Sequence, residues 1–182
     1  MAFISSFFLG TKERLYRSSL PPKLRFWKDL KGHHFEPEFK EAAKSEFYDN
    51  WNKGTFKPTQ LSDLPNNYKP IPLTWVFKYK CDKHGFLTKF KARICVRGDL
   101  QPYSDKETYA ATLATKSFRI LVAIMTKFDL DTIQMDAVSA FTNSLQDEVV
   151  YIEYPDGFKR PGWALLLQRA LYGLRRSPYL WQ

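Results

Sequence analysis

The chain has 182 residues, which is enough for one domain with a hydrophobic core, or for one small domain with an appendage. Hydrophobic residues make up 44% and aromatic residues 16%, a composition that excludes an intrinsically disordered chain. With 28 Lys and Arg against 19 Asp and Glu, the formal charge is +9, which favours an anionic partner such as nucleic acid, a nucleotide or a membrane surface.

The first part of the chain predicts two segments before any β-structure. "MAFISSFFLG" is apolar but too short to span a bilayer, and no signal-type cleavage site follows, so we expect a helical or packing segment there. Pro21 and Pro22 end it. A helix is expected from about Pro37 to Lys53, because Pro suits its first position and Gly54 supplies a stop.

A β-hairpin is predicted next. Residues 55–72 contain four prolines and are expected to form an extended connection. "TWVFKYK" and "FLTKFKARICVR" then alternate with a period of two, which is typical of half-buried strands. Asp82 and Gly85 lie between them and provide turn chemistry, so we predict a hairpin over about residues 73–97.

One face of this hairpin is expected to be basic. Between Lys78 and Gly98 there are seven Lys or Arg and one acid, so +6 of the total +9 lies here. Because alternate residues of a strand share a face, the cations of the second strand lie together and its apolar residues lie opposite. Two interpretations remain open, a solvated outer face or a surface that grips a phosphate chain with interleaved aromatic rings.

The cysteines and histidines argue against a disulfide or a zinc site. Cys81 and Cys95 would lie far apart along the hairpin, beyond disulfide reach, and are expected to be reduced thiols in an intracellular protein, cytoplasmic or nuclear. None of the three histidines has zinc-ligand spacing with either cysteine.

Beyond the hairpin, the chain predicts a helix and a strand. Ser117 is expected to cap a helix that reaches about Phe128. A buried strand is expected to end at Asp136, followed by a turn or short helix near residues 139–143. An acid in so apolar a run needs an ion pair, hydrogen bonds or a cation.

The last part of the chain predicts two further strands and a helix. Residues 148–155, "EVVYIEYP", predict a strand, and residues 163–174 predict a strand followed by a loop. Ser177 as cap and Pro178 at the first position predict the start of a helix.

Several of these segments resemble one known family. "KFKARICVRGDLQ" (89–101), "IQMDAVSAF" (133–141) and "RALYGLRRSPYLWQ" (169–182) resemble the reverse transcriptase domain of copia-type LTR retrotransposons. "KETYAATLATKSFRILVA" and "SLQDEVVYIEYPDGF", which link them, are similar to the family's linking segments. The resemblance covers about residues 70–182, and "FWKDLKGHHFEPEFKEAAKSEF" is similar to the lead-in of this domain.

The resemblance implies a fold class and a division of the chain. We expect an α+β fold that forms part of the fingers and palm of a reverse transcriptase, with an antiparallel sheet and packed helices. Residues 1–65 would be a lead-in with a helix near 37–53, residues 66–116 the fingers with the basic hairpin, and residues 117–182 an incomplete palm.

The resemblance also implies nucleotidyl transfer by two metal ions. Asp136 corresponds to the first catalytic, metal-binding carboxylate, and the backbone carbonyl of Ala137 is expected as a second ligand. The expected cofactor is Mg²⁺, which prefers oxygen ligands. Taken without its flanks, Asp136 also fits a capping acid for the turn that follows.

The other expected site residues bind the nucleotide or the nucleic acid. Lys91 and Arg93 correspond to the strand that grips the triphosphate, and which of them makes the contact is left open. Phe141 corresponds to the aromatic ring beside the sugar, although it also fits a core position. Tyr172 and Gly173 correspond to a loop against the nucleotide and template, or form a simple strand-to-helix turn. The nucleic-acid-binding residues are expected to be Lys78, Lys80, Lys89 and Arg97.

The sequence also departs from the family in one respect that matters for catalysis. The family's second carboxylate pair belongs to a Tyr-x-Asp-Asp motif, and the 182 residues contain no adjacent Asp-Asp. We therefore expect part of a reverse transcriptase that is inactive alone, or else a non-catalytic, sequence-indifferent nucleic-acid binder. By resemblance, the expected partners are an RNA template, a DNA primer, deoxynucleotides and the rest of the polymerase. No membrane partner is expected.

Overall fold

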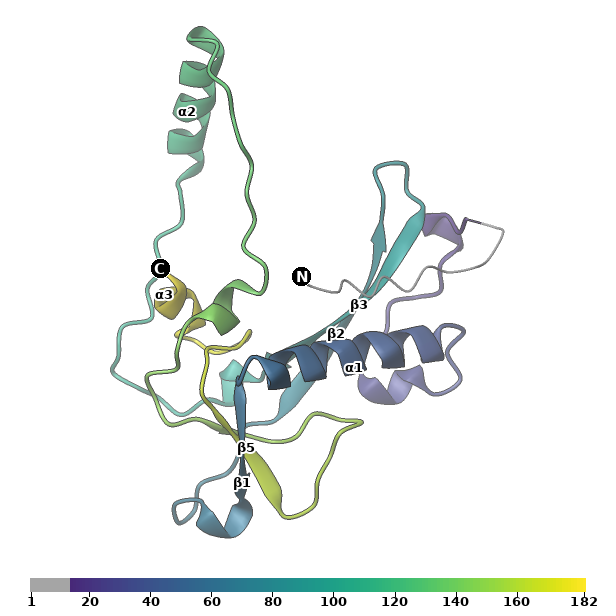
Figure 1. Cartoon of the computed structure of the whole chain (residues 1–182), viewed down its shortest axis with the longest axis vertical. Coiled ribbons are helices and arrows are strands. Elements are labelled where there is room, and N and C mark those ends of the chain that lie inside the picture. Colours follow the sequence, from purple (N-terminus) through teal and green to yellow (C-terminus); the bar gives the residue numbers. More distant parts are fainter. Residues whose placement is uncertain (1–13) are drawn as a thin grey trace.

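The computed structural model describes residues 14–182 as two small antiparallel sheets with helices beside them (Figure 1). The expected segment "MAFISSFFLG" lies outside the described residues. The expected α+β class is confirmed. In chain order the elements are η1 (Arg17–Ser19), η2 (Trp27–Leu30), α1 (Glu36–Asn52), β1 (Phe56–Gln60), η3 (Leu61–Asp63), β2 (Leu73–Cys81), β3 (Leu87–Val96), η4 (Gly98–Leu100), α2 (Thr115–Lys127), η5 (Ala140–Asn143), β4 (Tyr151–Ile152), β5 (Trp163–Leu167) and α3 (Ser177–Trp181).

The predicted hairpin is confirmed as β2 and β3. Its turn is built by Asp82, whose Oδ1 accepts hydrogen bonds of 2.9 Å from the backbone N–H groups of both His84 and Phe86. Gly85 supplies a positive φ of 89° in the same turn. The register places Cys81 opposite Leu87 and Cys95 opposite Thr74, and both thiols are free.

Helix α1 covers the apolar face of the hairpin (Figure 1). It begins at Glu36 with Pro37 in its first turn, and Gly54 follows its end with a φ of 68°, as the sequence predicted. The Phe39 ring lies 5.3 Å from that of Phe77 and 5.0 Å from that of Phe90, centroid to centroid. The hairpin therefore buries one face against α1, and its cationic side chains lie on the opposite, outward face.

The second sheet has the order β1-β5-β4. Residues 56–60 were expected to be part of an extended connection, and the structure shows that they form a strand paired with β5. Pro58 is accommodated because β1 is an edge strand of this sheet. The strand predicted at the start of residues 163–174 is confirmed as β5, whereas only Tyr151 and Ile152 of the predicted strand at 148–155 are in a strand. A parallel bridge from Ile71 to Ile152 joins this sheet to the start of the hairpin.

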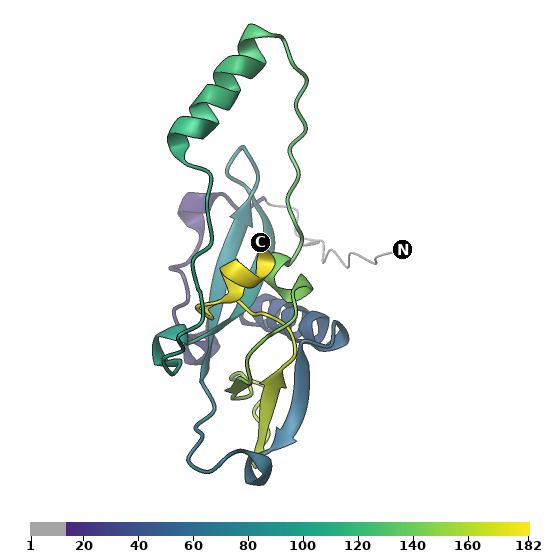
Figure 2. The same ribbon diagram turned by 90° about the vertical axis from the view of Figure 1, so that its left-hand side faces the viewer.

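Beyond Ala111, whose N–H donates to the Gln182 side chain, the chain leaves the body of the molecule as an arm that carries α2 and returns at η5 (Figure 2). The strand predicted to end at Asp136 is wrong, because residues 129–139 have no regular secondary structure and no neighbouring strand to pair with. Ile133 and Met135, expected to be buried, are 86% and 87% exposed. The apolar side chains of α2 are mostly exposed as well.

Two predicted helix caps are also wrong. Helix α2 begins at Thr115, so Ser117 lies inside its first turn, and no side-chain cap is present. Helix α3 begins at Ser177 itself, whose hydroxyl donates to the Leu171 carbonyl at 2.5 Å and is therefore not a cap. None of the helices in residues 14–182 is long and apolar enough to cross a membrane.

Candidate functional site

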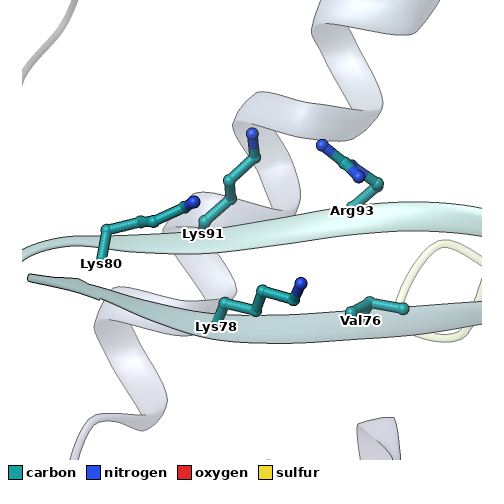
Figure 3. A pocket seen from close by; sticks show the side chains of 5 residues that line it. All are labelled: Val76, Lys78, Lys80, Lys91 and Arg93. Carbon is teal, nitrogen blue, oxygen red and sulfur yellow. The ribbon is translucent and has the colours of Figure 1, made fainter. Parts of the chain in front are cut away.

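The outward face of the hairpin gathers cations from both strands. In the β2–β3 register Lys78 lies opposite Lys91, Lys80 opposite Lys89, and Val76 opposite Arg93. Figure 3 shows the four cationic side chains that, with Val76, line a shallow depression of about 40 Å³. We call this set the basic face: Lys78, Lys80, Lys91 and Arg93. The sequence divided these residues between nucleotide and nucleic-acid contacts, and the structure brings them together.

Electrostatics make the basic face a place where an anion is favoured. Like charges directly opposite each other on paired strands repel. Burial lowers the pKa of Lys91, and the neighbouring charges of Arg93 and Lys80 lower it further. A bound polyanion would relieve this repulsion, because opposite charge at a few ångströms favours the charged forms of these groups.

Arg97 is separate from this set. Its guanidinium forms two hydrogen bonds to Asp99, from Nε at 2.8 Å and from Nη2 at 2.7 Å. This pairing raises the pKa of Arg97 and lowers that of Asp99. The charge of Arg97 is thus already compensated by a carboxylate, while Lys89 is exposed beside the basic face.

Among the expected nucleotide-site residues, Tyr172 contacts both Arg93 and Phe141. The Arg93 guanidinium carbon lies 4.1 Å from the centroid of the Tyr172 ring, and the Phe141 ring centroid lies 4.7 Å from that of Tyr172. The Val96 N–H donates to the Tyr172 carbonyl at 2.7 Å, which fixes the loop against β3. Gly173 has a φ of 93°, and a Cβ there would overlap the carbonyl oxygen of Val96. This position therefore requires glycine.

Asp136 and Ala137 are not part of this cluster of contacts. Both are exposed on the irregular segment between α2 and η5. In residues 14–182 no three His, Cys, Asp or Glu side chains come together in a way that could hold a metal ion. Magnesium needs several oxygen ligands at short distances. The arrangement of these residues therefore does not fit a magnesium site built by this part of the chain alone.

Glu46 is a carboxylate beside the basic face that the sequence did not single out. It lies on α1, and its Oε1 accepts a hydrogen bond of 3.3 Å from the Ile94 N–H on the outer edge of β3. Burial raises its pKa, against the opposing influence of this hydrogen bond and of Arg93 and Lys91. The signal available in the sequence was an acid between Ala43 and Phe47, two apolar residues that the structure shows to be buried.

Arg176 was also missed. It is only 5% exposed, and its Nη2 donates to Asp147 Oδ2 at 2.7 Å while its Nη1 donates to the carbonyl of Glu107. It ties the start of α3 to two segments that are distant in sequence. Arg175 precedes it with the same chemistry and is exposed, so the sequence offered no means of telling the two apart.

Comparisons with known proteins identify the family to which the chain is similar. The model of the family described as reverse transcriptase (RNA-dependent DNA polymerase) matches residues 56–182. The retrovirus-related Pol polyprotein from transposon TNT 1-94 of Nicotiana tabacum is 30% identical over 159 residues, which are 85% of this chain and 12% of the relative. The corresponding polyprotein from transposon RE1 of Arabidopsis thaliana is 30% identical over 122 residues, 64% of this chain and 8% of the relative.

The chain thus spans about one eighth or less of the length of these curated relatives. No solved structure matches it. Because the family model covers well over half of the chain and the relatives are copia-type Pol polyproteins, the chain belongs to the reverse transcriptase (RNA-dependent DNA polymerase) family of copia-type retrotransposons.

Proposed function

We propose that these 182 residues supply the nucleotide- and nucleic-acid-gripping part of an RNA-directed DNA polymerase. The observation that carries the proposal is the basic face, four cations from two paired strands. Such cation clusters bind phosphate groups. The counterions that the nucleic acid then releases favour binding without regard to its sequence. In this proposal residues 66–116 act as fingers and residues 117–182 as the first part of the palm.

The second part of the proposal concerns the incoming deoxynucleotide. Lys91 and Arg93 would contact its phosphates, with Phe141 beside its sugar and the Tyr172–Gly173 loop against its base or the template. The contacts among Arg93, Tyr172 and Phe141 support this assignment, since they bring residues from three distant segments into one place. A bulky ring at Phe141 would exclude a ribose 2′-hydroxyl by size.

The third part is that polymerisation needs carboxylates besides Asp136. The described residues do not fit a magnesium site by themselves, so Asp136 would act only with acids from further polypeptide. The exposed apolar side chains of α2 and of residues 129–138 support such completion, because contiguous exposed apolar surface marks an interface. The rest of the Pol polyprotein is the proposed source of this polypeptide, with an RNA template and a DNA primer as ligands.

The alternative function is non-catalytic binding of nucleic acid. It is favoured by the same two observations, a basic face that is present and a carboxylate set that is not assembled in residues 14–182. The two functions differ in whether Asp136 matters. A polymerase needs it, whereas a simple binder tolerates its loss.

Primer extension on an RNA template separates these functions. We expect no extension by the 182-residue chain, and extension by a version lengthened with a segment that carries the family's Tyr-x-Asp-Asp motif. Asp136→Asn should abolish the activity of the lengthened version. Extension by the short chain that depends on Asp136 would contradict the proposed need for further carboxylates. A lengthened version that is inactive but still binds nucleic acid would favour the alternative.

A further inference from the structure

Arg93 is the cation of the basic face whose position is fixed by an aromatic ring. Its guanidinium carbon lies 4.1 Å from the centroid of the Tyr172 ring, which is within the range of a cation–π interaction. Within residues 14–182, Arg93 forms no ion pair with a carboxylate. Lys91, its neighbour on the same face, has no such aromatic contact among the described residues. The ring therefore distinguishes Arg93 from Lys91.

The Tyr172 ring is itself held in place by backbone contacts. The Val96 N–H donates to the Tyr172 carbonyl, and Gly173 packs so closely on Val96 that a side chain could not be accommodated. On either side of this loop, Leu171 and Leu174 are buried. Because Val96 follows Arg93 on the same strand, these contacts fix the ring relative to the backbone that carries Arg93.

A fixed guanidinium binds phosphate at a lower entropic cost than a free one. Long cationic side chains lose rotamer freedom when they are immobilised, and pre-organisation removes part of that cost. The planar guanidinium can also donate to a phosphate in a bidentate manner while one of its faces rests on a ring. Tyr172 also contacts Phe141, so the ring places Arg93 at the border between the basic face and Phe141.

We propose that Tyr172 is a positioning residue, whose ring holds the Arg93 guanidinium where it meets the phosphates of a bound nucleotide. This inference rests on the proposed function, because it takes the basic face to be the phosphate-binding surface. It selects Arg93 over Lys91 as the cation that contacts the triphosphate most directly. It also assigns the action of Tyr172 to its ring, so that the hydroxyl is dispensable.

A double-mutant cycle on the 182-residue chain tests the proposal, with inorganic tripolyphosphate and dATP as probes in titration calorimetry. Tyr172→Leu should weaken binding by about three- to thirtyfold, the range of a partly desolvated cation–π contact. Tyr172→Phe keeps the ring and should change the affinity less than about twofold. In an Arg93→Gln background, Tyr172→Leu should have no further effect. Tyr68→Leu removes another half-buried tyrosine ring and serves as the matched control, with unchanged affinity expected.

A second readout follows the guanidinium itself. The Nε–Hε resonance of Arg93 should be shifted by the ring current in the wild type and in Tyr172→Phe, and should move to a free-arginine position in Tyr172→Leu. An unmoved resonance, or affinity losses that simply add in the double variant, would overturn the positioning role. If Arg93→Gln weakens binding but Tyr172→Leu does not, the positioning role of Tyr172 is refuted and the proposed function is not. If the wild type binds neither probe, both the positioning role and the proposed function are refuted.

Discussion

Gly98 and Gly173 pack backbone against backbone, so that a Cβ on Gly98 would overlap the carbonyl oxygen of Gly173. We expect Gly98→Ala to destabilise the fold by about 1–3 kcal/mol, the usual cost of overpacking, measured by urea denaturation. It should also weaken Arg93-dependent tripolyphosphate binding, because the Tyr172 loop must move away from β3. Gly54→Ala provides a comparison, since its surroundings are open and only its φ of 68° is strained. A loss of stability with unchanged tripolyphosphate binding would show that Gly98 stabilises the fold without contributing to the site.

Glu46 gives the fold a pH dependence whose sign follows from its pKa. Burial raises the pKa of Glu46, so the folded chain binds a proton more tightly than the unfolded chain does. The stability that protonated Glu46 contributes is therefore fully present below its unfolded pKa and is lost as the pH rises through the folded pKa.

Glu46→Gln removes this ionisation and keeps an oxygen that can accept the Ile94 N–H. We expect the variant to be more stable than the wild type at pH 7 and equally stable below about pH 4, by urea denaturation at both pH values. Glu41→Gln, on an exposed position of the same helix, should change stability by less than about 0.5 kcal/mol. A less stable Glu46→Gln at pH 7 would mean that attraction to Lys91 and Arg93 outweighs the burial of the charge.

The basic face predicts how binding of nucleic acid responds to salt. Replacing Lys78, Lys91 and Arg93 by Gln should reduce the slope of log affinity against log salt by about 0.9 for each duplex phosphate that is no longer neutralised. The control replaces three exposed lysines outside the hairpin, Lys53, Lys57 and Lys69, with the same change in net charge. Equal slopes for the two triple variants would show that only total charge matters.

Arg176 predicts a contribution to stability that lysine cannot replace. Arg176→Lys should cost about 1.5–3 kcal/mol, because lysine cannot form the paired hydrogen bonds to Asp147 together with the hydrogen bond to the Glu107 carbonyl. Arg175→Lys, at the exposed neighbouring position, should have an effect below about 0.5 kcal/mol in the same thermal or urea unfolding measurement.

The same ion pair should make the fold sensitive to acid. Burial raises the pKa of Asp147, but the hydrogen bond and charge of Arg176, with Lys106, outweigh it and hold the pKa below its usual value. The stability that Asp147 contributes is therefore present above its unfolded pKa and is lost as the pH falls. Arg176→Lys should reduce this loss between neutral and acidic pH. An unchanged pH profile would show that Lys106 alone accounts for the effect.

Local signals explain which elements the sequence predicted correctly. The hairpin and α1 are specified by features within their own segments, such as the Asp82–Gly85 turn, the alternation along residues 87–96, and the Pro37 and Gly54 boundaries. A strand, however, also needs a neighbour. The run from Ile133 to Asp136 has the composition of a buried strand. Whether a partner strand lies beside it depends on the rest of the fold, and in residues 14–182 none does.

The candidate site was predictable as a set of residues but not as an arrangement. The family resemblance named Arg93, Phe141 and Tyr172, while their contact depends on the pairing of Val96 with the Tyr172 loop, a long-range feature. Glu46 was not identified for the same reason, because its role depends on an N–H group of β3 that no helix pattern reveals.

Helix α1 lies outside the segment that matches the family model, which begins at residue 56. Yet Phe39 and Phe47 of this helix are buried in the core, and Phe39 packs on Phe77 and Phe90 of the hairpin. Each large apolar side chain exposed by removing α1 would cost about 1.5–3 kcal/mol, against a total stability of about 5–15 kcal/mol for a typical domain. The smallest part of this chain that we expect to fold independently therefore starts before the segment that matches the family model and includes α1.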